Sequence, residues 1–239
     1  LTSLQLWSNQ LTGPIPTEIG NLTSLKFLNF SGNQLNGTVP ASFGNLVSLQ
    51  ELYLNDNGFS GAMPATISSI TTFLTVDLSL NGFTSMPTIS AYNLNVADNS
   101  LDFGSLEASV ATTVNYQYSP QELLPPGGNV GFASGGAITI PFITSGTANQ
   151  YQWYRGSNPV PGATSSTLSI PTAGASDVGV YYLQITNTIA TGLTLQSEPY
   201  IVTLSTDPCI GIPRTRGFLQ TSFDPLIEVP TTVTAVGSQ

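Results

Sequence analysis

The sequence predicts a mainly β chain in which a solenoid of short parallel strands is followed by an antiparallel two-sheet sandwich. In the first half of the chain, asparagine recurs at intervals of 24 residues, at Asn9, Asn33, Asn57 and Asn81. Repetition at such a period is typical of stacked coils. Beyond residue 124 the period is lost, and short alternating segments separated by turn residues take its place, as in an antiparallel sandwich.

Each coil repeats one frame. The segment from Leu28 to Phe30 alternates with period two, which predicts a short strand. Asn33 follows it at a predicted turn, where a side-chain amide can both donate to and accept from the backbone of neighbouring coils. Gly37 and Pro40 shape the return path, because glycine permits unusual dihedral angles and proline fixes one. One coil cannot bury its own apolar face, so three or more coils must stack.

The frame becomes irregular toward residue 121. Asn99 arrives after 18 residues instead of 24, and the last strand is expected around Tyr116, with Ser119 and Pro120 in place of the asparagine turn. A degenerate last repeat is the usual cap of a solenoid. The turn residues predicted to be structural are Asn9, Asn33, Asn57, Asn81 and Asn99.

Short motifs connect this region to a known family. The segment Leu11–Pro16 carries the pattern L-x-G-x-I-P, and the Gly-Asn-Leu of residues 20–22 returns at residues 44–46. On these motifs, residues 1–121 resemble the plant-type subclass of the leucine-rich repeat family. Leu1 aligns with Leu25, inside a repeat, so we expect further coils to precede this segment in a longer protein.

Residues 124–205 read as a second domain. The segment 125–128, Pro-Pro-Gly-Gly, predicts a linker or domain edge. Strands are expected at residues 137–142, 151–154, 167–170, 181–185 and 200–204. Residues 206–239 fit neither pattern, and we expect a linker or the start of a further module there.

The second domain also resembles a known family. Trp153 stands where immunoglobulin-like domains carry their core tryptophan, and Asp177, Gly179 and Tyr181 match the motif D-x-G-x-Y-x-C, with Leu183 at the cysteine position. The resemblance implies a core built on Trp153 and a tyrosine corner at Tyr181. Cysteine-free modules of this kind resemble those of large bacterial surface and secreted proteins, including those of Bacteroidetes.

The composition limits the function classes. Charged residues make up 7% of the chain and the net charge is −9, with Lys26, Arg155, Arg214 and Arg216 as the positive residues. A nucleic-acid binder needs a basic footprint, and attraction to anionic lipid needs one too. With four positive residues the chain has no such footprint, so we expect no nucleic-acid partner and no membrane contact within this segment. No apolar run reaches membrane-spanning length. A surface of Ser, Thr, Asn and Gln is common in secreted and cell-surface proteins, so we expect an extracellular or cell-surface location.

The residue inventory argues against an enzyme. The chain contains no histidine and one cysteine, Cys209, which excludes Ser-His-Asp and Cys-His arrangements, histidine metal sites and an internal disulfide. Asp98 and Asp102 could form a glycosidase-type carboxylate pair, but we interpret them as solvated residues beside the asparagine turn. No catalytic residue, metal or cofactor is expected.

A binding surface can be read from the expected strands. Residues between the core positions of each strand point to the concave face. The expected members are Ser3, Gln5, Trp7, Phe27, Asn29, Ser31, Glu51, Tyr53, Asn55, Thr75, Asp77, Ser79, Asn93, Asn95, Ala97, Thr113, Asn115 and Gln117. Exposed aromatics among amides suit peptide or sugar recognition; alternatively, large side chains simply cover the strand backbone. The candidate ligand-binding residues are Trp7, Phe27, Asn29, Tyr53, Asn55, Asp77 and Asn95.

The functional hypothesis is a non-enzymatic extracellular or cell-surface binding or adhesion protein. Stacked repeats make an extended concave surface, which suits recognition of a protein or glycan partner. Two alternatives stay open: a structural spacer within a large multi-domain secreted protein, and the ectodomain of a leucine-rich repeat receptor. Saturable binding of a partner separates the hypothesis from a spacer.

Overall fold

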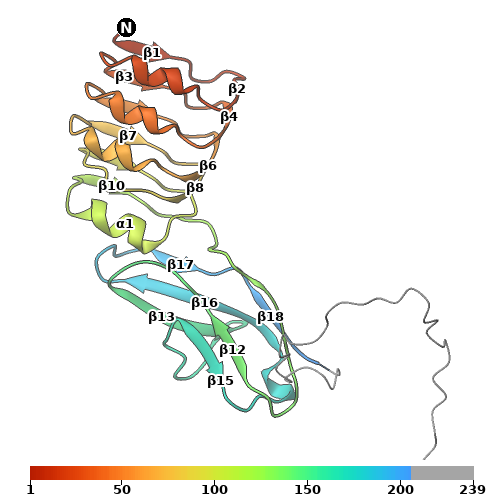
Figure 1. Ribbon diagram of the computed structural model, residues 1–239. Coiled ribbons are helices and arrows are strands. Elements are labelled where there is room, and N and C mark those ends of the chain that lie inside the picture. The colour runs from red at the N-terminus through yellow and green to blue at the C-terminus, as the bar shows by residue number, and fades with distance from the viewer. Residues whose placement is uncertain (206–239) are drawn as a thin grey trace, which may run out of the picture.

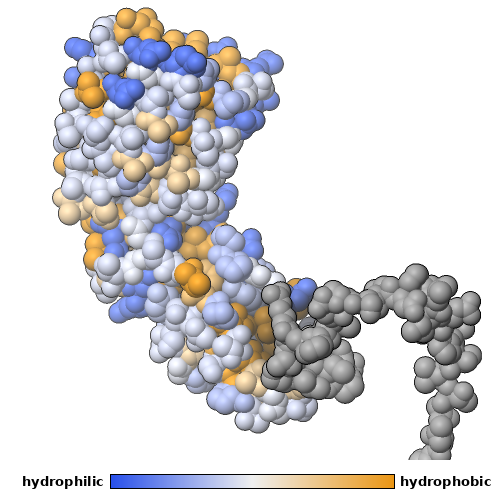
Figure 2. Space-filling view, in the orientation of Figure 1, coloured by the Kyte–Doolittle hydropathy of each residue, from blue (hydrophilic) through white to orange (hydrophobic). Residues whose placement is uncertain are grey.

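The structure, a computed structural model, describes residues 1–205 of the chain and is mainly β. The linker or further module predicted over residues 206–239 lies outside the described residues. Stacked coils form one part (residues 1–121, the repeat part), and two further sheets form another (residues 128–205, the two-sheet part) (Figure 1). Pale colours dominate the visible face of both parts (Figure 2), which fits a surface with few charged residues.

One strand from each coil joins a six-stranded sheet in which every pair is parallel. The strands, in spatial order, are β1 (Ser3–Gln5), β3 (Phe27–Asn29), β5 (Glu51–Tyr53), β7 (Thr75–Asp77), β9 (Asn93–Asn95) and β10 (Asn115–Gln117). The central residues of the inner strands are buried because they point into the coil. The prediction of a mainly β chain with short parallel strands is confirmed.

The asparagine after each strand ties the backbone of its own coil to that of the preceding coil. Asn33 Nδ2 donates to the carbonyl oxygens of Leu6 (2.9 Å), Phe30 (2.9 Å) and Ser31 (3.2 Å), and Asn33 Oδ1 accepts from the Leu11 amide (3.0 Å). One side chain therefore satisfies four backbone groups at a turn away from any regular ladder.

The same four-bond pattern recurs at Asn57, Asn81 and Asn99. Asn99 is fully buried. Asn9, in the first coil, is exposed and donates only to the carbonyl oxygens of Leu6 and Trp7. The two bonds that Asn9 does not make are those that the other asparagines form with the preceding coil.

A glutamine takes over this position in the last coil. Gln121 Nε2 donates to the carbonyl oxygens of Tyr118 (2.8 Å) and Val96 (2.9 Å), and its Oε1 accepts from the Leu101 amide (2.9 Å). The expectation that Ser119 and Pro120 simply replace the amide turn was wrong. The offset of three residues from Tyr118 to Gln121 equals that from Phe30 to Asn33, which was the missed signal.

The return path of each coil holds structure that the repeat frame did not predict. A second parallel sheet contains β2 (Thr12–Gly13), β4 (Gln34–Gly37), β6 (Gly58–Ala62) and β8 (Gly82–Ser85). Three 3-10 helices follow these strands: η1 (Thr17–Asn21), η2 (Ala41–Asn45) and η3 (Ala65–Ser69). Each begins directly after a proline with φ between −63° and −70°, the angle to which the ring restricts that residue.

The fifth coil returns through an α-helix, α1 (Phe103–Val110), which was not predicted. Asp102 caps it, because its Oδ1 accepts from the Ser105 amide at 3.2 Å. Phe103 and Leu106 are fully buried and stand three residues apart, the spacing of a helical apolar face. In the sequence, an aspartate followed by apolar residues three positions apart could have predicted this helix.

The two-sheet part holds a larger and a smaller sheet. The larger contains, in order, β11 (Gly128–Phe132), β18 (Tyr200–Leu204), β16 (Gly179–Asn187), β13 (Asn149–Arg155) and β14 (Asn158–Pro159), with β17 (Thr194–Gln196) also on β16. The smaller pairs β12 (Ile138–Pro141) with β15 (Thr167–Ile170). The strand pairs here are antiparallel except β11 with β18, which is parallel, so the antiparallel arrangement predicted for this part has one exception.

Trp153 lies at the centre of this part. Its side chain and that of Leu183, its register partner on β16, are fully buried, and its Nε1 donates to the Ser165 carbonyl at 3.0 Å. A Cβ on Gly179 would lie 3.3 Å from Arg155 Cγ, so glycine there leaves room for the arginine stem.

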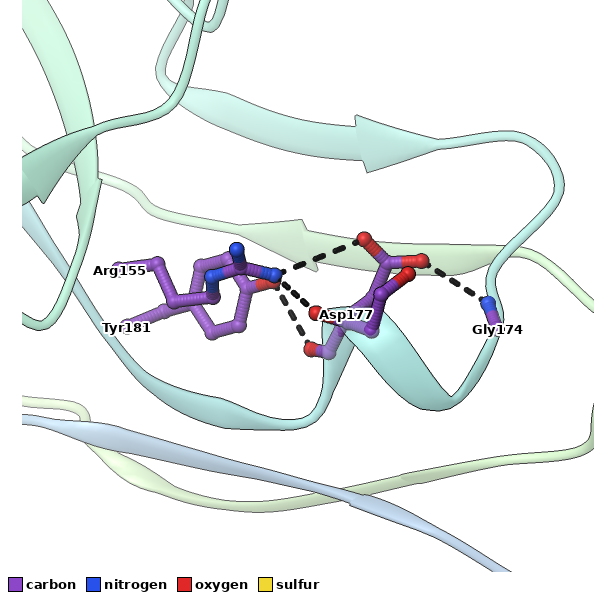
Figure 3. A network of polar contacts seen from close by, with 5 residues as sticks. Arg155, Gly174, Asp177 and Tyr181 are labelled. Carbon is purple, nitrogen blue, oxygen red and sulfur yellow. Dashed lines mark hydrogen bonds and ion pairs between the residues drawn. The ribbon is translucent and has the colours of Figure 1, made fainter.

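Asp177 organises one end of the two-sheet part (Figure 3). Its Oδ2 accepts from the Gly174 amide at 2.9 Å, and its carbonyl oxygen accepts from the buried Tyr181 hydroxyl at 2.9 Å. Arg155 Nη1 lies 3.8 Å from Asp177 Oδ1 and donates to the Ser176 carbonyl. The 3-10 helix η4 (Ala175–Asp177) is thereby held against β13 and β16.

Two carboxylates at α1 join the repeat part to the two-sheet part, next to which the helix lies (Figure 1). Asp102 Oδ2 accepts from the Ser145 amide (2.9 Å) and hydroxyl (2.7 Å). Glu107 accepts from the Thr147 amide (2.9 Å) and hydroxyl (2.8 Å) and from Asn187 Nδ2 (2.5 Å). These bonds set the orientation of one part on the other.

The contact is close as well as polar. A Cβ on Gly104 would lie 1.8 Å from Ser145 Oγ, so the helix admits only glycine there. Partial burial acts to raise the pKa of the Glu107 carboxyl, but the hydrogen bonds from Thr147, Asn187 and Ala148 outweigh it and hold the pKa below its ordinary value.

Replacing Asn99 by alanine should lower the free energy of unfolding by about 3 kcal/mol, because four buried backbone groups lose their partner. Urea denaturation followed by circular dichroism measures the change. The matched control is Asn9→Ala, at the exposed first turn, with an expected effect within about 0.5 kcal/mol. Equal effects of the two substitutions would contradict the importance of the amide bonds.

Acid should loosen the contact at Glu107. Since the folded-state pKa is lowered, the contribution is fully present above the ordinary value of 4.5 and is lost as the pH falls through the lowered pKa. Small-angle scattering should show the radius of gyration rising in that range, and already at neutral pH in Glu107→Ala. Glu18→Ala, an exposed glutamate of η1, is the control. A Glu107→Ala protein with an unchanged radius would refute this role.

Candidate binding face

The strand register sorts the concave side chains into two rows. The first row contains Ser3, Phe27, Glu51, Thr75, Asn93 and Asn115, and the second contains Gln5, Asn29, Tyr53, Asp77, Asn95 and Gln117. Asn115 pairs with Asn93, so Thr113 falls outside both rows and its assignment to this face was wrong. Trp7 and Asn55 stand two positions beyond the second row, after their strands end.

The two rows bring Phe27 and Tyr53 together. They lie on neighbouring strands, with ring centroids 5.7 Å apart and ring planes at 40°. The Tyr53 hydroxyl donates to Glu51 Oε2 at 3.0 Å, which fixes the direction of the ring. Trp7 is 55% exposed and stands apart from this pair. Of the three predicted aromatics, two therefore form one surface.

Three second-row residues bind their own backbone. The Oδ1 atoms of Asn29, Asp77 and Asn95 accept from amides two residues further on, those of Ser31 (2.9 Å), Ser79 (3.0 Å) and Ala97 (3.2 Å). Sequence patterning assigned all three to ligand binding, but their carbonyl-type oxygens are already used. What remains for a ligand is Asn29 Nδ2 and acceptor capacity on Asp77 Oδ2, because Asn95 Nδ2 already donates to Asp77 Oδ2 (3.3 Å) and Ser79 Oγ (3.2 Å).

A groove of about 580 Å³ lies over the later strands of this sheet, lined by side chains of β5, β7, β9 and β10. Its polar groups are already ordered by hydrogen bonds. Asn115 Nδ2 donates to Asn93 Oδ1 (2.8 Å), and Asn95 Nδ2 donates to Asp77 Oδ2 (3.3 Å). The groove is therefore polar and partly prearranged, with Tyr53 among its lining residues.

The end of the groove at Tyr53 lies next to negative charge. Burial raises the pKa of the Tyr53 hydroxyl, and the hydrogen bond to Glu51 and the negative charges of Glu51 and Asp77 raise it further, while a hydrogen bond with Thr75 opposes this. A ligand at this end of the groove meets the Tyr53 ring and the Asp77 carboxylate, and the Glu51 carboxylate lies against the Tyr53 hydroxyl.

The carboxylates considered for catalysis have structural roles. Asp102 is engaged with Ser105 and Ser145, and Asp98 holds a left-handed backbone conformation (φ 54°) in the turn before Asn99. Among residues 1–205, no three His, Cys, Asp or Glu side chains are placed to hold a metal ion. No helix in the same range is long and apolar enough to cross a membrane.

Comparison with known proteins matches residues 1–59 to the family model "Leucine rich repeat". No curated protein sequence matches the chain. Among solved structures, the PEPR1–AtPEP1 complex is 29% identical (TM-score 0.45), and the ectodomain of GASSHO1/SCHENGEN3 from Arabidopsis thaliana, in complex with CASPARIAN STRIP INTEGRITY FACTOR 2, is 26% identical (TM-score 0.42). Each match covers 54% of this chain and 19% of the other.

A further similar structure contains immunoglobulin domains 1–5 of Sidekick-1. It is 18% identical with a TM-score of 0.32, and the match covers 40% of this chain and 22% of the other. The chain thus spans about a fifth of the length of each of these three structures.

Proposed function

We propose that this chain is a non-enzymatic binding protein, located outside the cell or at its surface, whose concave face recognises an extended segment of a protein partner. The observation that carries the proposal is the ring pair of Phe27 and Tyr53 beside the polar groove. The core does not need these rings, because Leu28 and Leu52 fill the coil interior at full burial.

The geometry favours a peptide over a glycan. A sugar ring stacks best on a flat aromatic surface, whereas the planes of Phe27 and Tyr53 are tilted by 40° and form no common flat face. The three asparagines of the groove, Asn93, Asn95 and Asn115, are held by hydrogen bonds before binding, which lowers the entropic cost of association. An extended chain lying across the strands could therefore be read by the two rows.

The two-sheet part is proposed to be an immunoglobulin-like module that presents the repeat part. The buried Trp153 and the bond from the Tyr181 hydroxyl to the Asp177 carbonyl support this identity. The proposed boundaries are residues 1–121 and 124–205. The low fraction of charged residues supports an extracellular setting, and a receptor ectodomain is one form that such a protein could take.

A spacer role is the second candidate, and the polar contacts of Asp102 and Glu107 favour it. A spacer needs a fixed angle between its parts, and these carboxylates supply one. A spacer would bind nothing on its concave face.

The proposal is tested with a random-sequence peptide library displayed on phage and panned against the protein. We expect saturable binders whose affinity falls about 100-fold or more in the double variant Phe27→Ala, Tyr53→Ala, since two central aromatic contacts are lost. The matched control is Tyr154→Ala with Tyr182→Ala, a stacked pair 5.3 Å apart on the two-sheet part.

If the Phe27→Ala, Tyr53→Ala variant bound the peptides with full affinity, the binding site would lie outside the two rows. Failure to select any saturable peptide would leave the spacer role, unless a glycan array detects a sugar ligand, in which case the partner class is wrong.

A further inference from the structure

The charges on the concave face have one sign. Among the described residues of the two rows, Glu51 and Asp77 are the charged side chains, and both are acidic. Glu51 opposes Thr75, and Tyr53 opposes Asp77 across β5 and β7. The Tyr53 ring therefore has one carboxylate on its own strand and another on the next strand.

The charge of Asp77 is not needed for folding. Its Oδ1 makes the bond to the backbone amide two residues on that Asn29 and Asn95 make at the same position of other coils. A neutral amide thus serves the coil equally well. The second oxygen, Oδ2, accepts one long bond of 3.3 Å from Asn95 and leaves acceptor capacity toward the groove.

The charge of Glu51 is likewise free of a packing role. Its equivalents in the first row are serine, phenylalanine, threonine and asparagine, so the coil accepts many side chains there. Its Oε2 accepts from the Tyr53 hydroxyl, and Oε1 is left for another donor. Glu51 and Asp77 therefore lie next to the Phe27–Tyr53 pair, and neither has a basic partner in the two rows.

We propose that this face selects a lysine or arginine side chain of the bound polypeptide, with its stem against Phe27 and Tyr53 and its cationic head between Glu51 and Asp77. The inference rests on the proposed function and adds the chemical class of the partner. Long basic side chains lay their methylene stems on apolar surface, and their heads are attracted to aromatic faces and form charge-assisted hydrogen bonds with carboxylates.

Long-range charge supports the same partner. The chain has a net charge of −9, so a basic segment is drawn toward it at low ionic strength. An acidic or phosphorylated segment would instead meet Asp77 in the groove and Glu51 next to Tyr53, and the two rows hold no cation to pair with it.

The test uses the peptides selected by panning on the wild-type protein. We expect these to be enriched in lysine or arginine beside an apolar residue. The double variant Glu51→Gln, Asp77→Asn should bind them about tenfold or more weakly and should lose most of the weakening by added sodium chloride that the wild type shows. Asparagine at 77 preserves the backbone bond, as Asn29 and Asn95 do, so the variant should fold.

The matched control is Asp56→Asn with Asp98→Asn. Both residues lie at turns, in left-handed conformations that asparagine tolerates, and their replacement removes the same two charges away from the rows. Unchanged binding in this control and reduced binding in the Glu51, Asp77 variant would support a local role. Equal losses in the two variants would reduce the effect to net charge and overturn the inference.

The two proposals fail differently. Selected peptides without basic residues, or full affinity in the Glu51, Asp77 variant, would overturn the present inference while the requirement for Phe27 and Tyr53 still held. Loss of that aromatic requirement would overturn the proposed function itself. If the double variant has a reduced thermal midpoint, the affinity of the single variant Glu51→Gln is the test, because that row position accepts four other residue types.

Discussion

The repeat part depends on one amide per coil. A turn that packs against turns on both sides cannot leave its backbone groups to water, and burying them unpaired is costly. Asparagine and glutamine are the side chains that offer two N–H donors and an acceptor oxygen without charge. Asn99 makes the full set of bonds although its coil is six residues shorter than the others. The amide therefore constrains the turn, and the return path is free to be a strand and 3-10 helix or an α-helix.

The concave face follows from that constraint. Because every turn is locked in register with its neighbours, the strands align residue by residue, and side chains at equivalent positions form straight rows. The central residue of each strand fills the core, so the residues in the two rows are not needed for core packing. Serine, phenylalanine, glutamate, threonine and asparagine all occupy the first row, which leaves that row open to selection for binding.

Much of this could be read from the chain alone, and the omissions have physical causes. The period of 24 and the alternation at Leu28–Phe30 predict parallel strands and identify most concave residues. The second sheet was missed because its strands exist only through contacts between coils. Gln121 was missed because the repeat pattern was defined by asparagine, whereas glutamine carries the same amide on a side chain that is one methylene longer. The sequence showed three aromatics, but only the register of β3 and β5 shows that Phe27 meets Tyr53.

The joint at α1 has a consequence for synthesis on the ribosome. It is made of carboxylates, amides and hydroxyls, groups that water satisfies when the partner is missing. The coils leave the ribosome before the two-sheet part is synthesised. Until then water hydrates the Asp102 and Glu107 side chains, so no apolar patch is exposed at these positions. At these positions, therefore, the coils can complete their stack before residues 145–187 exist without adding to the exposed hydrophobic surface that drives misassembly of partly made proteins.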